Sequence, residues 1–274
     1  MKNAFDLSGK IAVITGGAGF LGQKHAEAIG EFGGIPIILD LNPTTIDDVV
    51  ENLRRKFENE AYGFATDITQ ESQVRETCDN IIRKFGRVDI LINNAANNPQ
   101  VNKTNQLQNT SRLENFPLDQ WNRDLAVGLT GSFLCAKYFG TSMAASSGGS
   151  IINIASDLAL IAPNQNLYKQ DGIPEQLQTV KPITYSVVKT ALLGLTRYLA
   201  TYWPEKGVRA NAICPGGVYA GQGEEFLMRI NSLIPMARMA KPDEIKGAIV
   251  FLASDASSYV NGAIIVADGG RCAW

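Results

Sequence analysis

Short apolar runs alternate with amphipathic stretches along most of the chain. The first run, Ile11–Ile14, ends at a Thr-Gly-Gly sequence and predicts a buried strand. Further strands are predicted near residues 35–39, 61–65, 88–92, 149–154, 208–213 and 263–266. Helices are predicted near residues 20–32, 44–59, 70–85, 118–146, 183–203 and 241–253. The runs are nearly continuous rather than alternating, which indicates a parallel sheet buried on both faces.

The regular alternation of strands and helices continues without a Ser- or Pro-rich linker. We therefore expect an α/β fold: a single doubly wound domain over residues 1–274, with a mostly parallel sheet of about seven strands and helices on both faces. Two long, polar, amide-rich stretches break the rhythm, at residues 97–116 and 157–184. Loops longer than about 12–15 residues are usually functional or disordered.

Composition excludes several classes of function. The chain of 274 residues is 45% hydrophobic and 19% charged, which is typical of a globular protein. A net charge of −2 gives none of the excess positive charge that is typical of proteins that bind nucleic acid or an anionic membrane. The single histidine, His25, rules out metal sites with two histidines, so we predict no metal and expect His25 to be a packing or surface residue.

The four cysteines are far apart and form no C-x-x-C pair, which favours reduced thiols. The N-terminus lacks the apolar segment of a signal peptide, and no run of 18 apolar residues occurs. We therefore expect a soluble cytoplasmic protein that acts on a small molecule, without a nucleic-acid or membrane partner.

A glycine-rich loop joins the first strand to the first helix. Gly16, Gly19 and Gly22 are spaced so that the backbone can turn tightly and bring the helix N-terminus to a pyrophosphate, as in a Rossmann-type fold. Asp40 ends the second strand, 18 residues after Gly22, where its carboxylate can accept hydrogen bonds from an adenosine ribose. The carboxylate would also repel a 2′-phosphate, so the sequence predicts NAD rather than NADP as cofactor.

Six motifs, in the same order, resemble those of the short-chain dehydrogenase/reductase family. They are TGGAGFLG at residues 15–22, Asp67 in TDIT, NNAA at residues 93–96, Ser156 in GSIINIAS, YSVVK at residues 185–189, and Pro215-Gly216. The C-terminal segment FLASDASSYVNGAIIVADGG is similar to the closing helix, strand and D-G-G turn of the family.

The resemblance implies an oxidoreductase that interconverts a secondary alcohol and a ketone. It implies Ser156, Tyr185 and Lys189 as catalytic residues, and it implies a homo-oligomer, either a tetramer or a dimer. The cofactor-binding residues that it implies are Gly16, Gly19, Leu21, Gly22, Asp40, Asp67, Ile68, Asn94, Ala95, Tyr185, Lys189, Pro215, Gly216 and Val218.

Tyr185 and Lys189 are four residues apart on a predicted helix and therefore share one face. A tyrosine with a pKa of about 10 is a poor base at neutral pH, but a neighbouring ammonium and an oxidised nicotinamide should both lower this pKa. We expect Tyr185 to be the general acid and base, and Lys189 to stabilise the phenolate and bind the nicotinamide ribose. Ser156 is expected to hydrogen-bond the substrate oxygen.

The chain departs from the family pattern at three positions. Phe20 stands in the loop where short members usually carry glycine, and Gly128 stands where the family commonly has an asparagine that supports a water-mediated proton relay. The relay is expected to survive in altered form or to be slower. The threonine that usually follows the P-G motif is absent from residues 215–220.

An insertion separates Ser156 from Tyr185, which are 29 positions apart, more than is usual in the family. Because it begins and ends at catalytic residues, it must lie close to the substrate entrance, where amides suit a polyol or sugar. The polar residues expected there are Asn164, Gln165, Asn166, Tyr168, Lys169 and Gln170, with Asn97, Asn98, Asn102 and Asn105 from the earlier loop. Lys103, Lys169 and Lys181 could also bind a phosphate. The alternative is an exposed loop whose polarity says nothing about the ligand.

The insertion also resembles that of family members in bacterial surface-sugar and flagellin-glycan pathways. Two alternatives to a dehydrogenase stay open at this point. One is a sugar epimerase or dehydratase that oxidises its substrate transiently, and the other is a dinucleotide-binding regulator without activity.

Overall fold

The computed structural model describes residues 3–97 and 110–274. Within these residues, seven parallel strands form one sheet in the order β3-β2-β1-β4-β5-β6-β7. The strands are β1 (Ile11–Thr15), β2 (Ile35–Asp40), β3 (Tyr62–Ala65), β4 (Ile90–Asn93), β5 (Gly149–Ile154), β6 (Val208–Pro215) and β7 (Ile264–Ala267). The predicted α/β fold with a parallel sheet is confirmed, and each predicted strand matches an observed one to within two residues.

The helices follow the predicted order with two differences. They are α1 (Phe20–Glu31), α2 (Pro43–Phe57), α3 (Glu71–Phe85), α5 (Leu118–Leu125), α6 (Gly131–Cys135), α7 (Thr141–Ala145), α8 (Ile183–Tyr202), α9 (Glu224–Asn231) and α10 (Lys246–Ala253). Two π-helical turns, η2 (Ala126–Thr130) and η3 (Ala136–Gly140), join α5, α6 and α7 into the single helical stretch predicted over residues 118–146. Helix α9 was not predicted, and a 3₁₀ turn, Pro242–Ile245, precedes α10.

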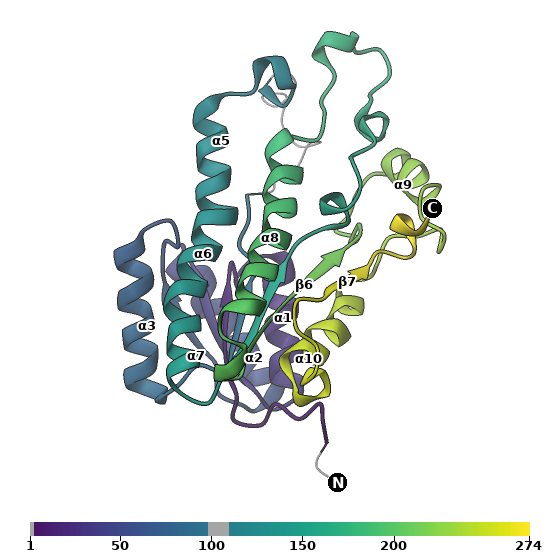
Figure 1. Cartoon of the computed structure of the whole chain (residues 1–274). Coiled ribbons are helices and arrows are strands. Elements are labelled where there is room, and N and C mark those ends of the chain that lie inside the picture. Colours follow the sequence, from purple (N-terminus) through teal and green to yellow (C-terminus); the bar gives the residue numbers. More distant parts are fainter. Residues whose placement is uncertain (1–2, 98–109) are drawn as a thin grey trace.

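Successive residues of each central strand face opposite sides of the sheet. Ile14 of β1 packs in the apolar core beneath α1, α2 and α10, whereas its neighbour Val13 packs in the core beneath α3, α6 and α8. Figure 1 shows α3, the α5–α7 stretch and α8 side by side along one face. Burial on both faces explains why the strands are continuous apolar runs in the sequence.

The chain changes direction between β1 and β4, which are neighbours in the sheet. At such a switch point the connections leave in opposite directions and open a crevice at the carboxyl ends of the strands. The side-chain amide of Asn94 donates to the carbonyls of Thr15 and Gly16, each at 3.0 Å, and the Thr15 hydroxyl accepts from the backbone N–H groups of Asn94 and Ala95 at 3.0 and 3.1 Å. These bonds hold the glycine loop over the crevice.

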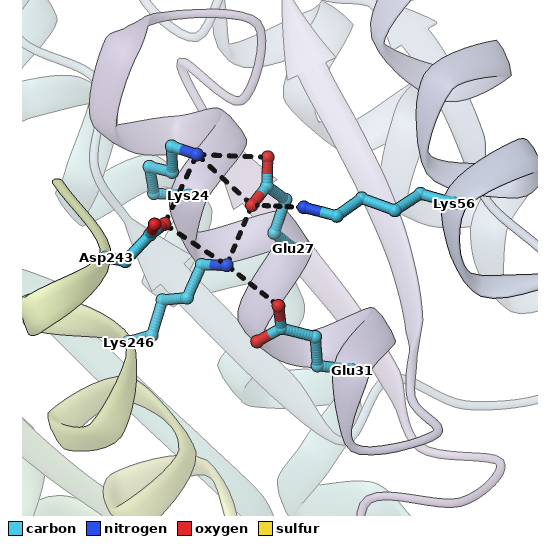
Figure 2. A network of polar contacts seen from close by, with 6 residues as sticks. All are labelled: Lys24, Glu27, Glu31, Lys56, Asp243 and Lys246. Atoms are coloured by element: carbon cyan, nitrogen blue, oxygen red, sulfur yellow. Dashed lines mark hydrogen bonds and ion pairs between the residues drawn. The ribbon is translucent and has the colours of Figure 1, made fainter.

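A network of three acidic and three basic side chains holds α1 against its neighbours (Figure 2). Its centre is Glu27 Oε2, which pairs with Lys246 at 2.7 Å, Lys56 at 2.9 Å and Lys24 at 3.2 Å. Burial disfavours the charged carboxylate, but the hydrogen bonds from the three lysines outweigh it, and the pKa of Glu27 is lowered. The network links α1 to α2 and α10, and it fixes the helix that begins at the glycine loop.

His25 of α1 is fully buried, so the expectation of a packing residue holds and its alternative, a surface residue, is wrong. Neither ring nitrogen has a hydrogen-bond partner among the described residues. Burial, the largest effect, lowers the pKa of His25 to about 3. The ring is therefore neutral in the folded protein at physiological pH.

The His25→Leu variant should make the stability of the protein less sensitive to acid. In the unfolded chain His25 binds a proton below a pKa of about 6.5, whereas the folded protein binds it only near pH 3. Between these values the unfolded state holds more protons, so this residue lowers the free energy of unfolding by up to about 1.4 kcal/mol per pH unit as the pH falls. Urea unfolding of both proteins from pH 7.5 to pH 4 measures how steeply the free energy of unfolding falls with pH. Equal slopes in the wild type and the variant would show that the folded protein binds this proton as readily as the unfolded chain.

Candidate functional site

The three predicted catalytic residues come from two elements. Ser156 follows β5, and Tyr185 and Lys189 lie on α8, which packs against the sheet beside that strand. Ser156 and Lys189 are each 5% exposed, and Tyr185 is partly buried. The structure therefore brings the three residues together near the carboxyl end of β5.

Two lysines lie near the Tyr185 ring. Lys181 Nζ is 3.8 Å from the ring centroid, and Lys189 Nζ is 5.9 Å from it and donates to the carbonyl of Ile154 at 2.7 Å. Burial, followed by the charge of Lys181, lowers the pKa of Lys189 to about 8. Burial also lowers the pKa of Lys181 to about 8.

The pKa of Tyr185 differs from the prediction that Lys189 would lower it. Burial raises this pKa, the Ser156 side chain opposes the rise in part, and the negative charge of Asp157 adds to it. The prediction is therefore wrong for the protein groups alone, because burial of the phenolate, the largest effect, outweighs the Ser156 hydrogen bond that opposes it.

A buried ion pair next to Ser156 was missed by sequence reasoning. The Ser156 hydroxyl donates to Asp157 Oδ1 at 2.8 Å, and Arg271 Nη1 donates to Asp157 Oδ2 at 2.7 Å. Asp157 is 3% exposed and Arg271 is 8% exposed. The pair orients the Ser156 hydroxyl through Asp157 and ties the C-terminal turn to the site. A charged residue directly after the serine was the only signal available in the sequence.

A second buried carboxylate, Asp124 of α5, was also missed. It is 5% exposed, and it accepts hydrogen bonds from the Thr184 hydroxyl, from the Gln120 amide at 2.6 Å and from the Asn97 amide at 3.2 Å. Thr184 directly precedes Tyr185 in the chain. The carboxylate therefore lies at the side of the site where α5 meets α8.

Gly128 lies one helical turn after Asp124, within the π-helical turn η2. A Cβ atom at this position would lie 2.4 Å from Cγ1 of Val188, the residue before Lys189. Contacts below 3.0 Å essentially never occur for real Cβ atoms. Val188 thus fills the space that a side chain at position 128 would need, and glycine fits beside it.

The glycine loop has the close contacts that its spacing predicted. Gly16 has φ of +60°, and a Cβ there would lie 2.9 Å from Ala95 Cα. A Cβ on Gly22 would lie 2.1 Å from the carbonyl oxygen of Gly16. Gly19 is the N-cap of α1, and no side chain caps this helix end. Uncapped N–H groups at a helix N-terminus favour an anion, so this cradle fits a pyrophosphate.

The two predicted acidic contacts of the cofactor are held in fixed orientations. Asp40 Oδ2 accepts from the backbone N–H of Ala18 in the glycine loop at 3.0 Å, and Oδ1 accepts from that of Leu41 at 2.8 Å. Asp67 Oδ1 accepts from the backbone and the hydroxyl of Thr69 at 2.9 and 2.7 Å. Asp40 ends β2 and Asp67 follows β3, the two strands that continue the sheet beyond β1 on the adenosine side of a dinucleotide laid across the crevice.

The remaining predicted cofactor residues lie at the same edge of the sheet. Leu21 is in the first turn of α1, and Ile68, Ala95 and Gly216 follow β3, β4 and β6, with Pro215 at the end of β6. Val218 forms a bridge with Ala240 just beyond them. The carboxyl ends of parallel strands meet at one edge, so the residues present fit a dinucleotide along it.

The insertion packs against α9 rather than lying free at the entrance. Leu167 joins Ile230 of α9 in a small apolar cluster, and the ring centroids of Tyr168 and Phe226 are 6.0 Å apart. The charges of Arg271, Tyr185 and Asp157 act on Tyr168, whose pKa burial raises to about 12. Tyr168 is therefore close enough to the site for the charges of Tyr185 and Asp157 to act on it.

Several amides of the insertion bond to its own backbone. Asn164 accepts from the backbone N–H of Asn166, and Gln165 from that of Lys181. The Gln178 amide donates to the carbonyls of Gln170 and Ile173. The side-chain oxygens of Asn164 and Gln165 thus stabilise the loop, both residues are exposed, and their place in a substrate lining stays a prediction. Asn98, Asn102, Lys103 and Asn105 lie outside the described residues.

Neither a metal site nor a membrane helix is found in residues 3–97 and 110–274. No group of three His, Cys, Asp or Glu side chains there is arranged to hold a metal ion. No helix in the same residues is long and apolar enough to cross a membrane.

Comparisons with known proteins agree with this arrangement. A family model described as short chain dehydrogenase matches residues 10–168, and one described as Enoyl-(Acyl carrier protein) reductase matches residues 175–271. The chain is similar to a D-threitol dehydrogenase of Mycolicibacterium smegmatis, with 32% identity over 97% of this chain and 94% of the relative. It is also similar to an NAD-dependent glycerol dehydrogenase of Listeria innocua, with 28% identity over 97% of this chain and 95% of the relative.

Among solved structures, the chain resembles a gluconate 5-dehydrogenase from Burkholderia cenocepacia in complex with NADP and tartrate. The TM-score is 0.85 at 28% identity, and the match covers 99% of this chain and 98% of the other. The similar proteins therefore include one named as NAD-dependent and one solved with NADP. None of these comparisons bears on surface-sugar or flagellin-glycan pathways, so that resemblance of the insertion stays a prediction.

Proposed function

Because this chain belongs to the short-chain dehydrogenase/reductase family, we propose that it is an NAD-dependent dehydrogenase that interconverts a secondary alcohol and a ketone on a polyol or sugar-acid substrate. The observation that carries the proposal is the position of Ser156, Tyr185 and Lys189 beside a glycine loop at the switch point of the sheet. The substrate class is supported by relatives named for threitol, glycerol and gluconate.

In the proposed reaction, each residue of this chain has a separate task. Ser156 would hold the substrate oxygen by turning to it the hydroxyl proton that bonds to Asp157 in this structure. Tyr185 takes the hydroxyl proton during oxidation and returns it during reduction. When bound, the dinucleotide supplies the hydride acceptor, and its positive nicotinamide favours the Tyr185 phenolate that burial disfavours. Lys189, whose Nζ is 5.9 Å from the Tyr185 ring centroid, would bind the nicotinamide ribose.

The preference for NAD is a part of the proposal that rests on Asp40. Its carboxylate is held at the end of β2 by two backbone N–H groups, and the next residue, Leu41, is exposed and uncharged. A 2′-phosphate placed there would meet this negative charge. The same position is suited to accept hydrogen bonds from the two ribose hydroxyls of NAD.

The Asp40→Asn variant should lose most of this preference. We expect the ratio of kcat/KM with NAD to kcat/KM with NADP to fall about 100-fold, because one charge repulsion and one charge-assisted hydrogen bond are removed. The control is Asp47→Asn, an exposed aspartate on α2, which makes the same change of charge at a position that is not expected to contact the ribose. Steady-state rates with both cofactors measure the ratio. An unchanged ratio in Asp40→Asn would contradict the role of Asp40.

We also propose that residues 1–274 form one cytoplasmic domain, with the insertion at 157–184, and that it assembles as a dimer or tetramer. Three of the four cysteines, which are all free thiols, are buried. Exposed apolar rings on the outer helices support assembly: Phe133 of α6 is 49% exposed, and Tyr198 and Tyr202 of α8 are 61% and 56% exposed.

A further inference from the structure

Two cavities meet at Asp124. The smaller one, of about 10 Å³, is lined by Tyr185, Lys189, Thr184, Gly128 and Asp124. The larger one, of about 550 Å³, is lined by Gln120, Arg123 and Asp124, and by several exposed residues that place it at the surface. Asp124 contributes to the walls of both, together with Ala96 and Asn97. A carboxylate therefore stands between the catalytic pair and solvent.

The smaller cavity has the size and lining for one water molecule. A volume of about 10–15 Å³ of this kind holds a single water, provided that two to four polar groups surround it. The Lys189 ammonium, the Tyr185 hydroxyl, the Thr184 hydroxyl and the Asp124 carboxylate belong to residues of its wall. A water there can contact groups from both α8 and α5.

The two oxygens of Asp124 have different partners. Oδ1 accepts from the amide groups of Gln120 and Asn97, which can only donate through nitrogen. Oδ2 accepts from the Thr184 hydroxyl, which can rotate and accept a hydrogen bond instead. Oδ2 is thus the oxygen that can take a proton and keep its hydrogen bond, with the direction of that bond reversed.

We infer that Asp124 is the outer acceptor of a proton relay that connects Tyr185 and Lys189, through one water, to the larger cavity. The inference rests on the proposed function. During oxidation the C–H bond breaks with transfer of hydride to NAD, the O–H bond breaks with transfer of its proton to Tyr185, and the carbonyl forms. The proton then passes through Lys189 and the water to Asp124 Oδ2, and from there to solvent in the larger cavity. In reduction the proton moves in the opposite direction.

Asp124 is the outer acceptor of the relay because Gly128 has no side chain to contribute. Val188 occupies the space where a Cβ at position 128 would lie, and the Gly128 carbonyl already accepts from the Ser132 hydroxyl at 2.9 Å. The charged groups of residues lining the two cavities are Lys189 and Asp124 at the inner one, and Asp124 and Arg123 at the outer one. Asp124 is the carboxylate common to both.

The test compares Asp124→Asn with Asp119→Asn, which makes the same change at an exposed position on the same helix, α5. We expect kcat of Asp124→Asn to fall about 10- to 100-fold with unchanged NADH affinity, because an amide cannot take the proton. Formate added to the assay should restore part of the loss by carrying the proton through the larger cavity, and it should not affect Asp119→Asn. Steady-state kinetics across pH, with and without formate, measure both effects.

The outcomes separate the relay from the proposed function. Turnover of polyols and sugar acids by the wild type tests the function, and the ratio of the two asparagine variants tests the relay. Equal kcat in both variants would overturn the inference, as would a loss in Asp124→Asn that formate does not change, since that indicates a structural role. Should Asp124→Asn fail to fold, Thr184→Val keeps the carboxylate and removes the reversible hydrogen bond. The relay then predicts a smaller loss of kcat, again relieved by formate, and wild-type kcat in this variant would overturn it.

Discussion

The Tyr185→Phe variant is expected to turn over substrate at least about 1000-fold more slowly than the wild type, with nearly unchanged affinity for NADH. The substitution removes the hydroxyl that exchanges the proton with substrate and leaves the ring in place. The ring contact of Lys181 at 3.8 Å should persist, because it involves the face of the ring rather than the hydroxyl. The change therefore isolates the acid and base chemistry from the packing of α8.

The matched control is Tyr198→Phe, on the same helix at a position that is 61% exposed. It removes one tyrosine hydroxyl without touching the candidate site and should keep wild-type turnover. Stopped-flow measurement of NADH binding, together with steady-state turnover, separates affinity from chemistry. Turnover of Tyr185→Phe within about tenfold of the wild type would sink the role assigned to Tyr185.

The Gly22→Ala variant should lose NADH affinity about 100-fold and lower the free energy of unfolding by about 1–3 kcal/mol. Its new Cβ would lie 2.1 Å from the Gly16 carbonyl oxygen and 2.7 Å from Gly17 Cα. Both are backbone atoms, so the helix and the glycine loop must move apart. The loop that is positioned for the pyrophosphate then loses its geometry.

Gly194→Ala on α8 is the control for this substitution. It is also a glycine within a helix, but an added Cβ would have no atom within 4 Å apart from its chain neighbours and the backbone of its own helix. Alanine should raise the free energy of unfolding here by about 0.5–1 kcal/mol, because it reduces the conformational entropy of the unfolded chain. It should leave NADH binding unchanged. Titration of NADH by fluorescence and unfolding in urea measure the two effects. Equal affinities of the two variants would contradict the close packing at Gly22.

Local patterns in the sequence determined the order of strands and helices along the chain and the glycine-rich loop after β1. A strand buried on both faces must be apolar at every position, so each strand is visible in a few consecutive residues. The turn after β1 needs its glycines within eight residues, and Tyr185 and Lys189 share a face because a helix repeats every 3.6 residues. Helix α9 escaped prediction because it is short and its buried Ile230 packs only in the small cluster with the insertion.

Tertiary structure alone decided which side chains pair with one another in the candidate site. Asp157 meets Arg271 across 114 positions, and Asp124 meets Thr184 across 60, so no spacing rule could pair them. Nor could the sequence show that burial raises the pKa of Tyr185, since desolvation depends on what surrounds the ring. Chemistry that depends on neighbours along one helix or turn can thus be predicted from the sequence. Pairs of polar and charged groups that are distant in the sequence form only once the chain has folded.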